Sequence, residues 1–320
     1  MLTTPVAFIV FNRPDLTEQV FAAIRHAQPE KLYIIADGAR NAEEQPLVRQ
    51  TRAVAEAVDW PCTVTRIYSN QNLGCRKRVI SGLKEVFANE EAAIILEDDC
   101  LPHPSFFGFC EAMLRQYSGQ ANIGTIHGTA LPGVNEAGHA YLSKFSIVWG
   151  WATTRRVWQW VDPGVAEWGQ LKKTDWLRKH FPGQKHLQYG VARMFDLMQA
   201  GYDAWSYALL FAILRHNLLN IYPPANLISN IGFDIRAAHT HQVKPYSNLP
   251  LADPAWQWQH GSPPIYHADN DVKIFETLYY WHLQKPTFFK KWKRKAWIYL
   301  YNLKQKWIPG ISLKKTISPR

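Results

Sequence analysis

The sequence lacks the features that would place the protein in a membrane or in a secretory pathway. Its 320 residues contain no uninterrupted run of about 18 apolar residues, which a membrane-spanning helix requires. The amino terminus, MLTTPVAFIVFNRP, has no basic segment before its short apolar stretch, so we expect a strand there and not a signal peptide. The four cysteines have neither CxxC nor zinc-ligand spacing. These absences predict a cytoplasmic protein with reduced thiols.

Acidic residues are absent from residue 281 to the end, and this absence explains the basic net charge. Eleven of the 36 Lys and Arg lie in that stretch, which leaves 25 in the preceding residues against all 26 Asp and Glu. The net charge of +10 therefore belongs to the carboxyl-terminal segment, and the rest of the chain is close to neutral. We predict no nucleic-acid partner for such a body.

The same basic segment is rich in aromatic residues. Trp292 and Trp297 stand among several lysines, a pattern that favours a helix lying on an anionic membrane surface over residues 285–320. The alternative is a terminal helix that packs on the body and exposes its lysines to water. We expect a domain over residues 1–270 and a separate basic aromatic segment over residues 271–320.

The glycine motifs of two common nucleotide-binding folds are also missing. A Rossmann dinucleotide fold needs GxGxxG after its first strand and a P-loop enzyme needs GxxxxGK, and neither occurs. Apolar strand patterns nevertheless alternate with helical periodicity, which predicts an α/β fold with a mainly parallel sheet. Strands are expected at 6–11, 31–36, 63–68, 92–96 and 123–128, and helices over LTEQVFAAIRHA and at 42–58, 76–88 and 104–117.

Polar residues directly follow three of these predicted strands. Arg13 comes after the first strand, Asp37 after the second, and Glu97-Asp98-Asp99 after the fourth. Because parallel strands end at one edge of a sheet, these side chains are expected to converge. Three adjacent carboxylates repel one another unless a cation or hydroxyl groups share their field, so the triplet is a candidate metal site. Taken alone, the triplet has a solvated turn as its alternative interpretation.

Five motifs, taken in order, are similar to those of a known family: PVAFIVFNRP, IIADG, NLGCRKRVISGL, AIILEDDCLPHPSFF and WGWATTRRVW. They resemble GT-A-fold glycosyltransferases, and more closely the bacterial family related in pattern to N-acetylglucosaminyltransferase I, from about residue 5 to about residue 240. The resemblance implies a nucleotide-diphospho-sugar transferase fold, with a sheet flanked by helices. The nucleotide-sugar-binding half would be residues 1–103 and the acceptor half residues 104–270.

The resemblance also implies a role for each strand-end residue. Arg13 and Asp37 would hold the nucleobase, and Asp98 would bond the ribose. Taken singly, Arg13 has a helix-entry arginine as its alternative and Asp37 a turn former before Gly38. Asp99 would ligate Mn²⁺ or Mg²⁺ bridging the diphosphate, and Glu97 would face the sugar. A hard cation held by carboxylate and phosphate oxygens suits a reaction whose leaving group is a nucleoside diphosphate.

Further residues are candidates for contact with the donor. Arg76 and Lys77 follow the segment NQNLG and are expected to meet phosphate, with an exposed helical face as the alternative. Trp149 and Trp151 are spaced by one residue, which places both on one strand face, where both could be core or both could line a cleft. Trp149 is expected near the sugar. His239, in the matching stretch AHTH, is a candidate second metal ligand, with a hydrogen-bonded loop histidine as the alternative.

Attack by an acceptor hydroxyl requires a base, usually a carboxylate. In the family that the chain resembles, an acid directly follows the Trp of a DxW stretch, which matches residues 203–205, but Ser206 stands at that position. Asp203 is the nearest substitute, with an N-cap of the following helix as its alternative role. Asp162 and Asp234 are further candidates.

The sequence therefore predicts a metal-dependent, inverting glycosyltransferase, either a hexosyl- or an N-acetylhexosaminyltransferase. It would move a sugar from a UDP- or GDP-type nucleotide-sugar donor to a glycan or lipid-linked acceptor, in the cytoplasm and peripherally on the inner face of the membrane. A nucleotidylyltransferase is the alternative, although FNRPDL supplies no glycine-rich loop after the first strand. A GT-A-like polyanion- or membrane-binding protein without activity is the third reading, supported by Ser206.

Overall fold

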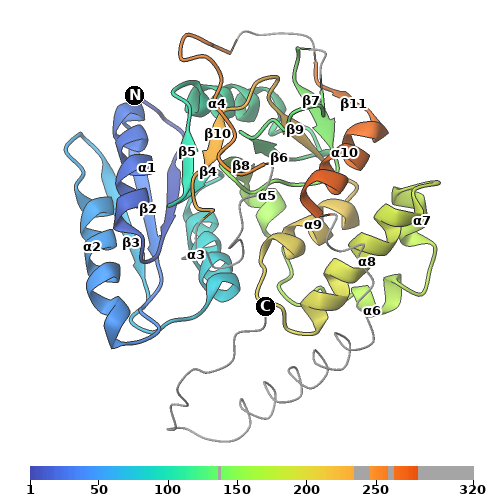
Figure 1. Ribbon diagram of the computed structural model, residues 1–320, viewed down its shortest axis with the longest axis horizontal. Coiled ribbons are helices and arrows are strands. Elements are labelled where there is room, and N and C mark those ends of the chain that lie inside the picture. Colours follow the sequence, from blue (N-terminus) through green and yellow to red (C-terminus); the bar gives the residue numbers. More distant parts are fainter. Residues whose placement is uncertain (136–137, 234–245, 259–262, 280–320) are drawn as a thin grey trace, which may run out of the picture. The chain divides into compact units, whose positions relative to one another are not determined.

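The computed structural model describes residues 1–135, 138–233, 246–258 and 263–279. These residues form a large sheet of nine strands (Figure 1). Its strand order is β11-β7-β9-β6-β8-β4-β1-β2-β3. The strands are β1 (Val6–Val10), β2 (Lys31–Ala36), β3 (Thr63–Tyr68), β4 (Ala92–Glu97), β6 (Ile123–His127), β7 (Tyr141–Ser143), β8 (Trp151–Thr154), β9 (Leu219–Tyr222) and β11 (Ile265–Tyr266). A second, two-stranded antiparallel sheet pairs β5 (Cys100–Pro102) with β10 (Ile228–Asn230).

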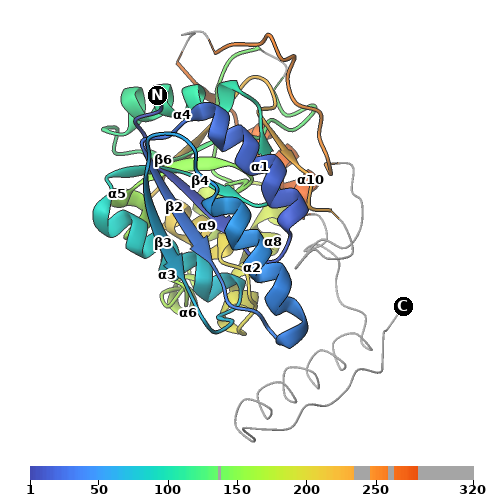
Figure 2. The ribbon, with the colours of Figure 1, turned by 90° about the vertical axis from the view of Figure 1, so that its left-hand side faces the viewer.

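Helices cover both faces of the large sheet. They are α1 (Pro14–Ala27), α2 (Gln45–Glu56), α3 (Cys75–Asn89), α4 (Ser105–Tyr117), α5 (Arg155–Trp158), α6 (Trp168–Leu171), α7 (Trp176–His180), α8 (Lys185–Gln199), α9 (Ser206–Arg215) and α10 (Ala268–Tyr279), with a short 3-10 helix at Ala42–Glu44. Figure 2 shows α1 and α2 on one side of β2 and β3 and α3 on the other. The predicted α/β class, a mainly parallel sheet flanked by helices, is confirmed.

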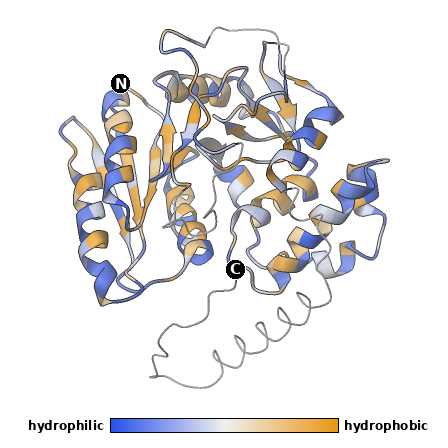
Figure 3. Ribbon diagram, in the orientation of Figure 1, coloured by the Kyte–Doolittle hydropathy of each residue, from blue (hydrophilic) through white to orange (hydrophobic). Residues whose placement is uncertain are grey.

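Alternating side chains of the buried strands form two separate cores. Phe8 and Ile34 point to the face covered by α1, α2 and α4, whereas Ile9 and Ile35 point to the face covered by α3, α5 and α9. All five residues of β1 are buried, as expected for a parallel strand with a helical layer on each side. In Figure 3 the central strands are apolar along their length, while the helices are apolar on one side only.

The topology places a crevice at the carboxyl ends of β1 and β4. The chain runs outward from β1 through β2 to β3 and then returns, through α3, to β4 on the opposite side of β1. Strand order therefore reverses between β1 and β4, and in open α/β sheets ligands bind at such a switch point. The strand-end polar residues that the sequence singled out lie at this edge.

The globular unit extends beyond the boundary predicted at residue 270. It spans Met1–Tyr280, and α10 crosses the predicted boundary. The carboxylate of Asp271 accepts hydrogen bonds from Ser143 Oγ at 2.6 Å and from the Lys144 N–H at 2.9 Å, which ties α10 to the end of β7. The first residues of the segment predicted as a tail thus belong to the folded body.

Some sequence predictions lie outside the described residues. His239, Asp234 and the segment 285–320 are among them. Within the described residues, no helix combines the length and the apolar character needed to cross a bilayer.

Candidate functional site

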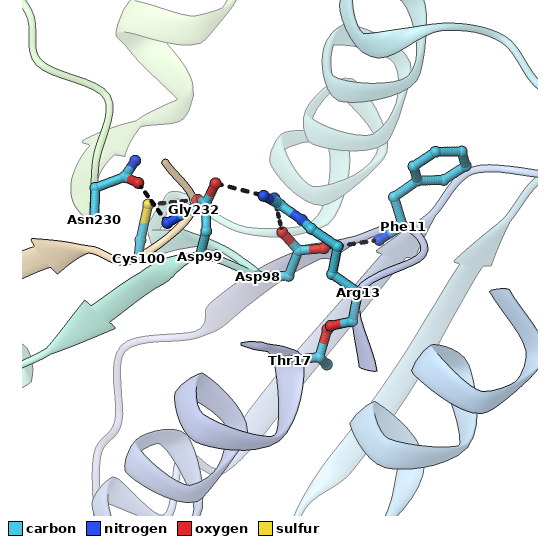
Figure 4. A network of polar contacts seen from close by, with 8 residues as sticks. All are labelled: Phe11, Arg13, Thr17, Asp98, Asp99, Cys100, Asn230 and Gly232. Carbon is cyan, nitrogen blue, oxygen red and sulfur yellow. Dashed lines mark hydrogen bonds and ion pairs between the residues drawn. The ribbon is translucent and has the colours of Figure 1, made fainter. Parts of the chain in front are cut away.

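An arginine joins the ends of β1 and β4 across the switch point (Figure 4). The Nη2 group of Arg13 forms an ion pair with Asp98 Oδ1 and a second with Asp99 Oδ2, the latter at 2.9 Å. The other oxygen of Asp98 accepts the Phe11 N–H at 3.3 Å. The prediction that Arg13 and the acidic triplet converge is therefore confirmed by their contacts.

Burial and charge together set the proton affinities of this cluster. Burial raises the pKa of Glu97 to about 8, and the nearby Asp99 and Asp98 add to the rise while Arg13 opposes it. Burial raises the pKa of Asp98 to about 6, with Arg13 opposing the rise. For Arg13 itself burial acts to lower the pKa, but Asp98 and Asp99 outweigh it and raise the pKa above its usual value. One fixed cation thus faces three carboxyl groups, an arrangement that favours an additional cation.

The end of β10 and the two residues that follow it pack directly on Asp99. The Ile231 N–H donates to the Asp99 carbonyl oxygen at 2.8 Å, and the Gly232 N–H donates to Asn230 Oδ1 at 3.0 Å. A Cβ atom on Gly232 would lie only 2.1 Å from Asp99 Oδ2 (Figure 4). Glycine at this position therefore fixes the place of the Asp99 carboxylate by close approach.

A Gly232→Ala variant is expected to be less stable by about 1–3 kcal/mol, because the new methyl group forces the segment or the Asp99 carboxylate to shift. The free energy of unfolding from urea denaturation checks this. Gly119→Ala is the matched control, since a Cβ there meets nothing within 4 Å. Equal stability of the two variants would contradict the close packing of Gly232 on Asp99.

Asp37, at the end of β2, fixes the loop that leads into α3. Its carboxylate accepts the N–H groups of Leu73 at 2.9 Å, of Gly74 at 3.0 Å and of Gly38 at 2.9 Å. The amide of Asn72 donates to it as well, at 3.1 Å. The bond from the Gly38 N–H fits the alternative role of Asp37 as a turn former, whereas its bonds to residues 72–74 were not predicted from the sequence. The predicted contact of Asp37 with a nucleobase stays a prediction.

Asp203 lies at the amino end of α3 and not at the start of the helix that follows it in sequence. Its Oδ1 accepts the Arg76 N–H at 2.9 Å, in the first turn of α3, where Gly74 at the cap position has no side chain. The next helix, α9, begins at Ser206, with Trp205 at its cap position. Asp203 was expected, as an alternative to a catalytic role, to cap the helix that follows it. It caps α3 instead, because the fold brings the start of α3 beside it.

The two tryptophans predicted to share a strand face lie on opposite faces of the sheet. Trp149 precedes β8 and packs against Phe233, with ring centroids 5.7 Å apart. Trp151 is buried in the other core, stacked on Trp205 at 5.6 Å. The chain turns at Gly150, whose φ of 61° is in the left-handed region, so the strand period does not extend back to Trp149. The shared-face prediction is wrong.

These elements enclose a cavity of about 300 Å³ at the switch point. Five of the side chains that the sequence predicted for the site line it, together with residues from the start of α3. Its lining includes Phe11, Asn12, Arg13, Asp37, Arg40, Asn72, Gly74, Cys75, Arg78, Glu97, Asp98 and Asp203. Among the described residues, Trp149 is not part of this lining.

The basic residue that α3 brings to the cavity is Arg78. Arg76 is half-buried and Lys77 is exposed, and neither lines the cavity, whereas Arg78 is 7% exposed and does. Helical spacing could have indicated this position. Arg78 stands beside Val79 and one turn before Gly82, on the buried face of α3. Arg78 thus lies in the cavity wall and the two predicted residues do not, while their contact with phosphate stays a prediction.

A divalent cation is compatible with the chemistry of this cluster but has few protein ligands. Within the described residues, no group of three or more His, Cys, Asp or Glu is arranged to hold a metal ion. Both oxygens of Asp98 accept hydrogen bonds, and so do both oxygens of Asp99, from Arg13 Nη2 at 2.9 Å and from the Cys100 thiol at 3.4 Å. The Asp99 side chain is 15% exposed and is not part of the cavity lining. The predicted role of Asp99 as a metal ligand stays a prediction, and a cation there would need further ligands from substrate and water.

The fold and the site together define an α/β protein with a charged cavity at the switch point of its sheet. No family model matches the chain, and no curated protein matches it. Solved structures with a partial likeness include UDP-glucose pyrophosphorylase complexed with UDP-glucose, at 11% identity and a TM-score of 0.36, covering 69% of this chain and 90% of that one. S. aureus TarS 1-349 has 10% identity and a TM-score of 0.35, covering 49% of this chain and 48% of that one.

HddC from Yersinia pseudotuberculosis complexed with GMP-PN is a third such structure, at 9% identity and a TM-score of 0.32, covering 48% of this chain and 78% of that one. Likenesses of this size do not define a family. None of these three relates the chain to N-acetylglucosaminyltransferase I.

Proposed function

We propose that the protein is a glycosyltransferase that takes a sugar from a UDP- or GDP-type donor. One observation carries the proposal: a single cavity at the switch point is lined by Arg13, Asp37, Asp98, Glu97 and Asp203. These residues come from the ends of three parallel strands and from a loop of the second half of the chain. Such an arrangement supplies hydrogen-bond acceptors for a nucleoside, a carboxylate cluster for a cation and a carboxylate for proton transfer.

A metal ion would act at Asp99 in this proposal. Asp99 would hold Mn²⁺ or Mg²⁺, and the ion when bound would neutralise the charge that develops on the leaving nucleoside diphosphate. Arg13 keeps the carboxylates of Asp98 and Asp99 together at the end of β4. Glu97, which directly precedes Asp98 in the chain and lines the cavity, would face the transferred sugar.

Asp203 is proposed as the base of a direct displacement. The acceptor oxygen would form a bond to the anomeric carbon while the bond from that carbon to the phosphate oxygen breaks, and the hydroxyl proton would pass to Asp203. The Arg76 N–H, bonded to Asp203 Oδ1 at 2.9 Å, would hold the carboxylate in place. A single displacement of this kind inverts the configuration of the sugar.

The turn between β1 and α1 supports transfer of a sugar over transfer of a nucleotidyl group. A nucleotidylyltransferase would cradle triphosphate with a glycine-rich loop after its first strand. Here three residues, Phe11, Asn12 and Arg13, connect the two elements, and Arg13 is engaged with Asp98 and Asp99. The acceptor, glycan or lipid-linked, and the membrane contact of residues 285–320 remain predictions.

Ligand-induced stabilisation tests the proposal. We expect UDP or GDP, with Mn²⁺, to raise the melting temperature, since a ligand at 100 times its Kd adds about 2.7 kcal/mol to the free energy of unfolding. Incubation with nucleotide sugars should then release nucleoside diphosphate slowly. The proposal fails if neither diphosphate shifts melting, as for an inactive binding protein, or if the enzyme instead joins a nucleoside triphosphate to a sugar phosphate and releases pyrophosphate.

A further inference from the structure

Arg78 is a buried cation in the wall of the cavity. It lies in the first turns of α3, where its N–H donates to the Gly74 carbonyl oxygen at 2.9 Å. Only 7% of the residue is exposed, and it lines the cavity together with Gly74, Cys75 and Val79. The guanidinium is thus held at the amino end of a 15-residue helix.

The charge of Arg78 is not matched by an ion pair. In the described part of the chain its guanidinium has no carboxylate within ion-pair distance, and its buried Nε has no hydrogen-bond partner. The other basic residues in the cavity wall differ, since Arg13 pairs with two aspartates and Arg40 pairs with Glu44. Burying an unpaired cation costs several kcal/mol, and burial lowers the pKa of Arg78 accordingly.

Neighbouring carboxylates act on Arg78 only from beyond ion-pair distance. Burial lowers the pKa of Arg78, and Asp37 and then Glu85 oppose this through space, but neither forms an ion pair with it. The Asp37 carboxylate also accepts the backbone N–H groups of Leu73 and Gly74. Burial raises the pKa of the Cys75 thiol, and the carboxylates of Glu97 and Asp203 add to the rise, so the thiol stays neutral. An anion that pairs directly with Arg78 would therefore enter the cavity from outside.

The helix that carries Arg78 reinforces the demand for an anion. The amino end of α3 faces the cavity through Gly74 and Cys75, and a helix amino terminus carries about half a positive charge. The Asp203 carboxylate accepts one N–H of this end, that of Arg76, at 2.9 Å. Arginine has five N–H donors and no acceptor, and its planar fork matches phosphate oxygens. A buried fork and a helix terminus on one wall form an anion site of the kind that phosphate occupies.

We propose that Arg78 is the phosphate-binding residue of this cavity, where its guanidinium pairs with the diphosphate of the bound nucleotide. The nucleotide part of this inference rests on the proposed function, whereas the anion part rests on Arg78 alone. Arg78 is a positioning residue: it holds the diphosphate while the carboxylates at the end of β4 hold the rest of the donor.

Isothermal titration calorimetry with the full chain tests this inference. The probes are UDP, GDP, uridine, guanosine and inorganic pyrophosphate, added to the wild type and to Arg78→Met. We expect Arg78→Met to weaken binding of the diphosphates and of pyrophosphate roughly 10- to 100-fold, because a hydrogen-bonded charge pair is lost, and to leave nucleoside binding unchanged. Lys84→Met is the matched control, since Lys84 is an exposed cation on the same helix. Arg78→Lys should recover part of the affinity.

The outcomes separate this inference from the proposed function. If the wild type binds UDP or GDP and Arg78→Met binds it equally well, the inference fails and the function stands. An equal loss for uridine and UDP would also overturn it, since Arg78 would then contact the base. If the wild type binds neither nucleotide but binds pyrophosphate through Arg78, the function fails and the anion site stands. A melting-temperature comparison of the variants confirms that each is folded.

Discussion

Asp99→Ala is expected to abolish metal-dependent transfer while the fold remains intact. The reason is that Asp99 is the proposed ligand of the cation, and a metal ion supplies several kcal/mol of charge stabilisation to a departing diphosphate. That loss corresponds to a rate reduction on the order of 10³-fold or more. The measurement is the initial rate of nucleoside diphosphate release from UDP- and GDP-sugars with Mn²⁺ or Mg²⁺.

The exposed pair Arg25–Asp59 offers a control for this experiment. Arg25 Nε lies 3.0 Å from Asp59 Oδ1, and the Asp59 side chain is 65% exposed. Asp59→Ala should leave the rate unchanged. Asp99→Ala also relieves the repulsion among three crowded carboxylates. The melting temperature of this variant should therefore not fall. Activity of Asp99→Ala within about threefold of the wild type would contradict the metal assignment, because it would leave no room for the loss expected above.

Arg13→Met is expected to lower the free energy of unfolding by about 3–5 kcal/mol. Arg13 pairs with both Asp98 and Asp99, and its removal leaves buried carboxylates without a cation. The Asp98 side chain is only 4% exposed, so water cannot replace the lost partner. Denaturation in urea at pH 8 measures the effect, with Arg25→Met as the matched control, whose exposed ion pair is worth at most about 1 kcal/mol.

The dependence of this loss on pH has a definite sign. Burial raises the pKa of Asp98 to about 6, above its usual value, and without Arg13 it rises further. A carboxyl group with a raised pKa binds its proton more readily in the folded state, so stability falls as pH increases through that pKa. Arg13→Met should therefore be destabilised less at pH 5 than at pH 8, and Asp98→Asn should rescue it at pH 8. A loss below about 1 kcal/mol at both pH values would contradict the buried ion pairs, because exposed pairs are worth that little.

The strand ends could be predicted from the sequence because local pattern and topology agree there. The apolar run that ends at Glu97 is buried on both faces, and right-handed crossovers bring its end beside those of β1 and β2. Arg13, Asp98 and Asp99 therefore meet although 85 residues separate the first two. The strands β2 and β3 have the predicted bounds.

Residues whose role depends on tertiary packing could not be assigned in the same way. Arg76, Lys77 and Arg78 are adjacent and chemically alike, and only the orientation of α3 on the sheet selects Arg78 for the cavity. Asp203 caps a helix that starts 128 residues earlier in the chain, which no local pattern encodes. The position of Trp149 was missed because a strand period was extended through a glycine with positive φ.

The antiparallel pairing of β4 with β8 has a consequence for how the chain can diversify. The strand that carries the acidic triplet is hydrogen-bonded to β8 in the predicted acceptor half, and Asp203 of that half caps α3 in the predicted nucleotide-sugar-binding half. Exchanging either half for that of another protein would therefore break the pairing of strands in the middle of the sheet. Changes in the loops that border the cavity would alter ligand preference while the sheet stays the same.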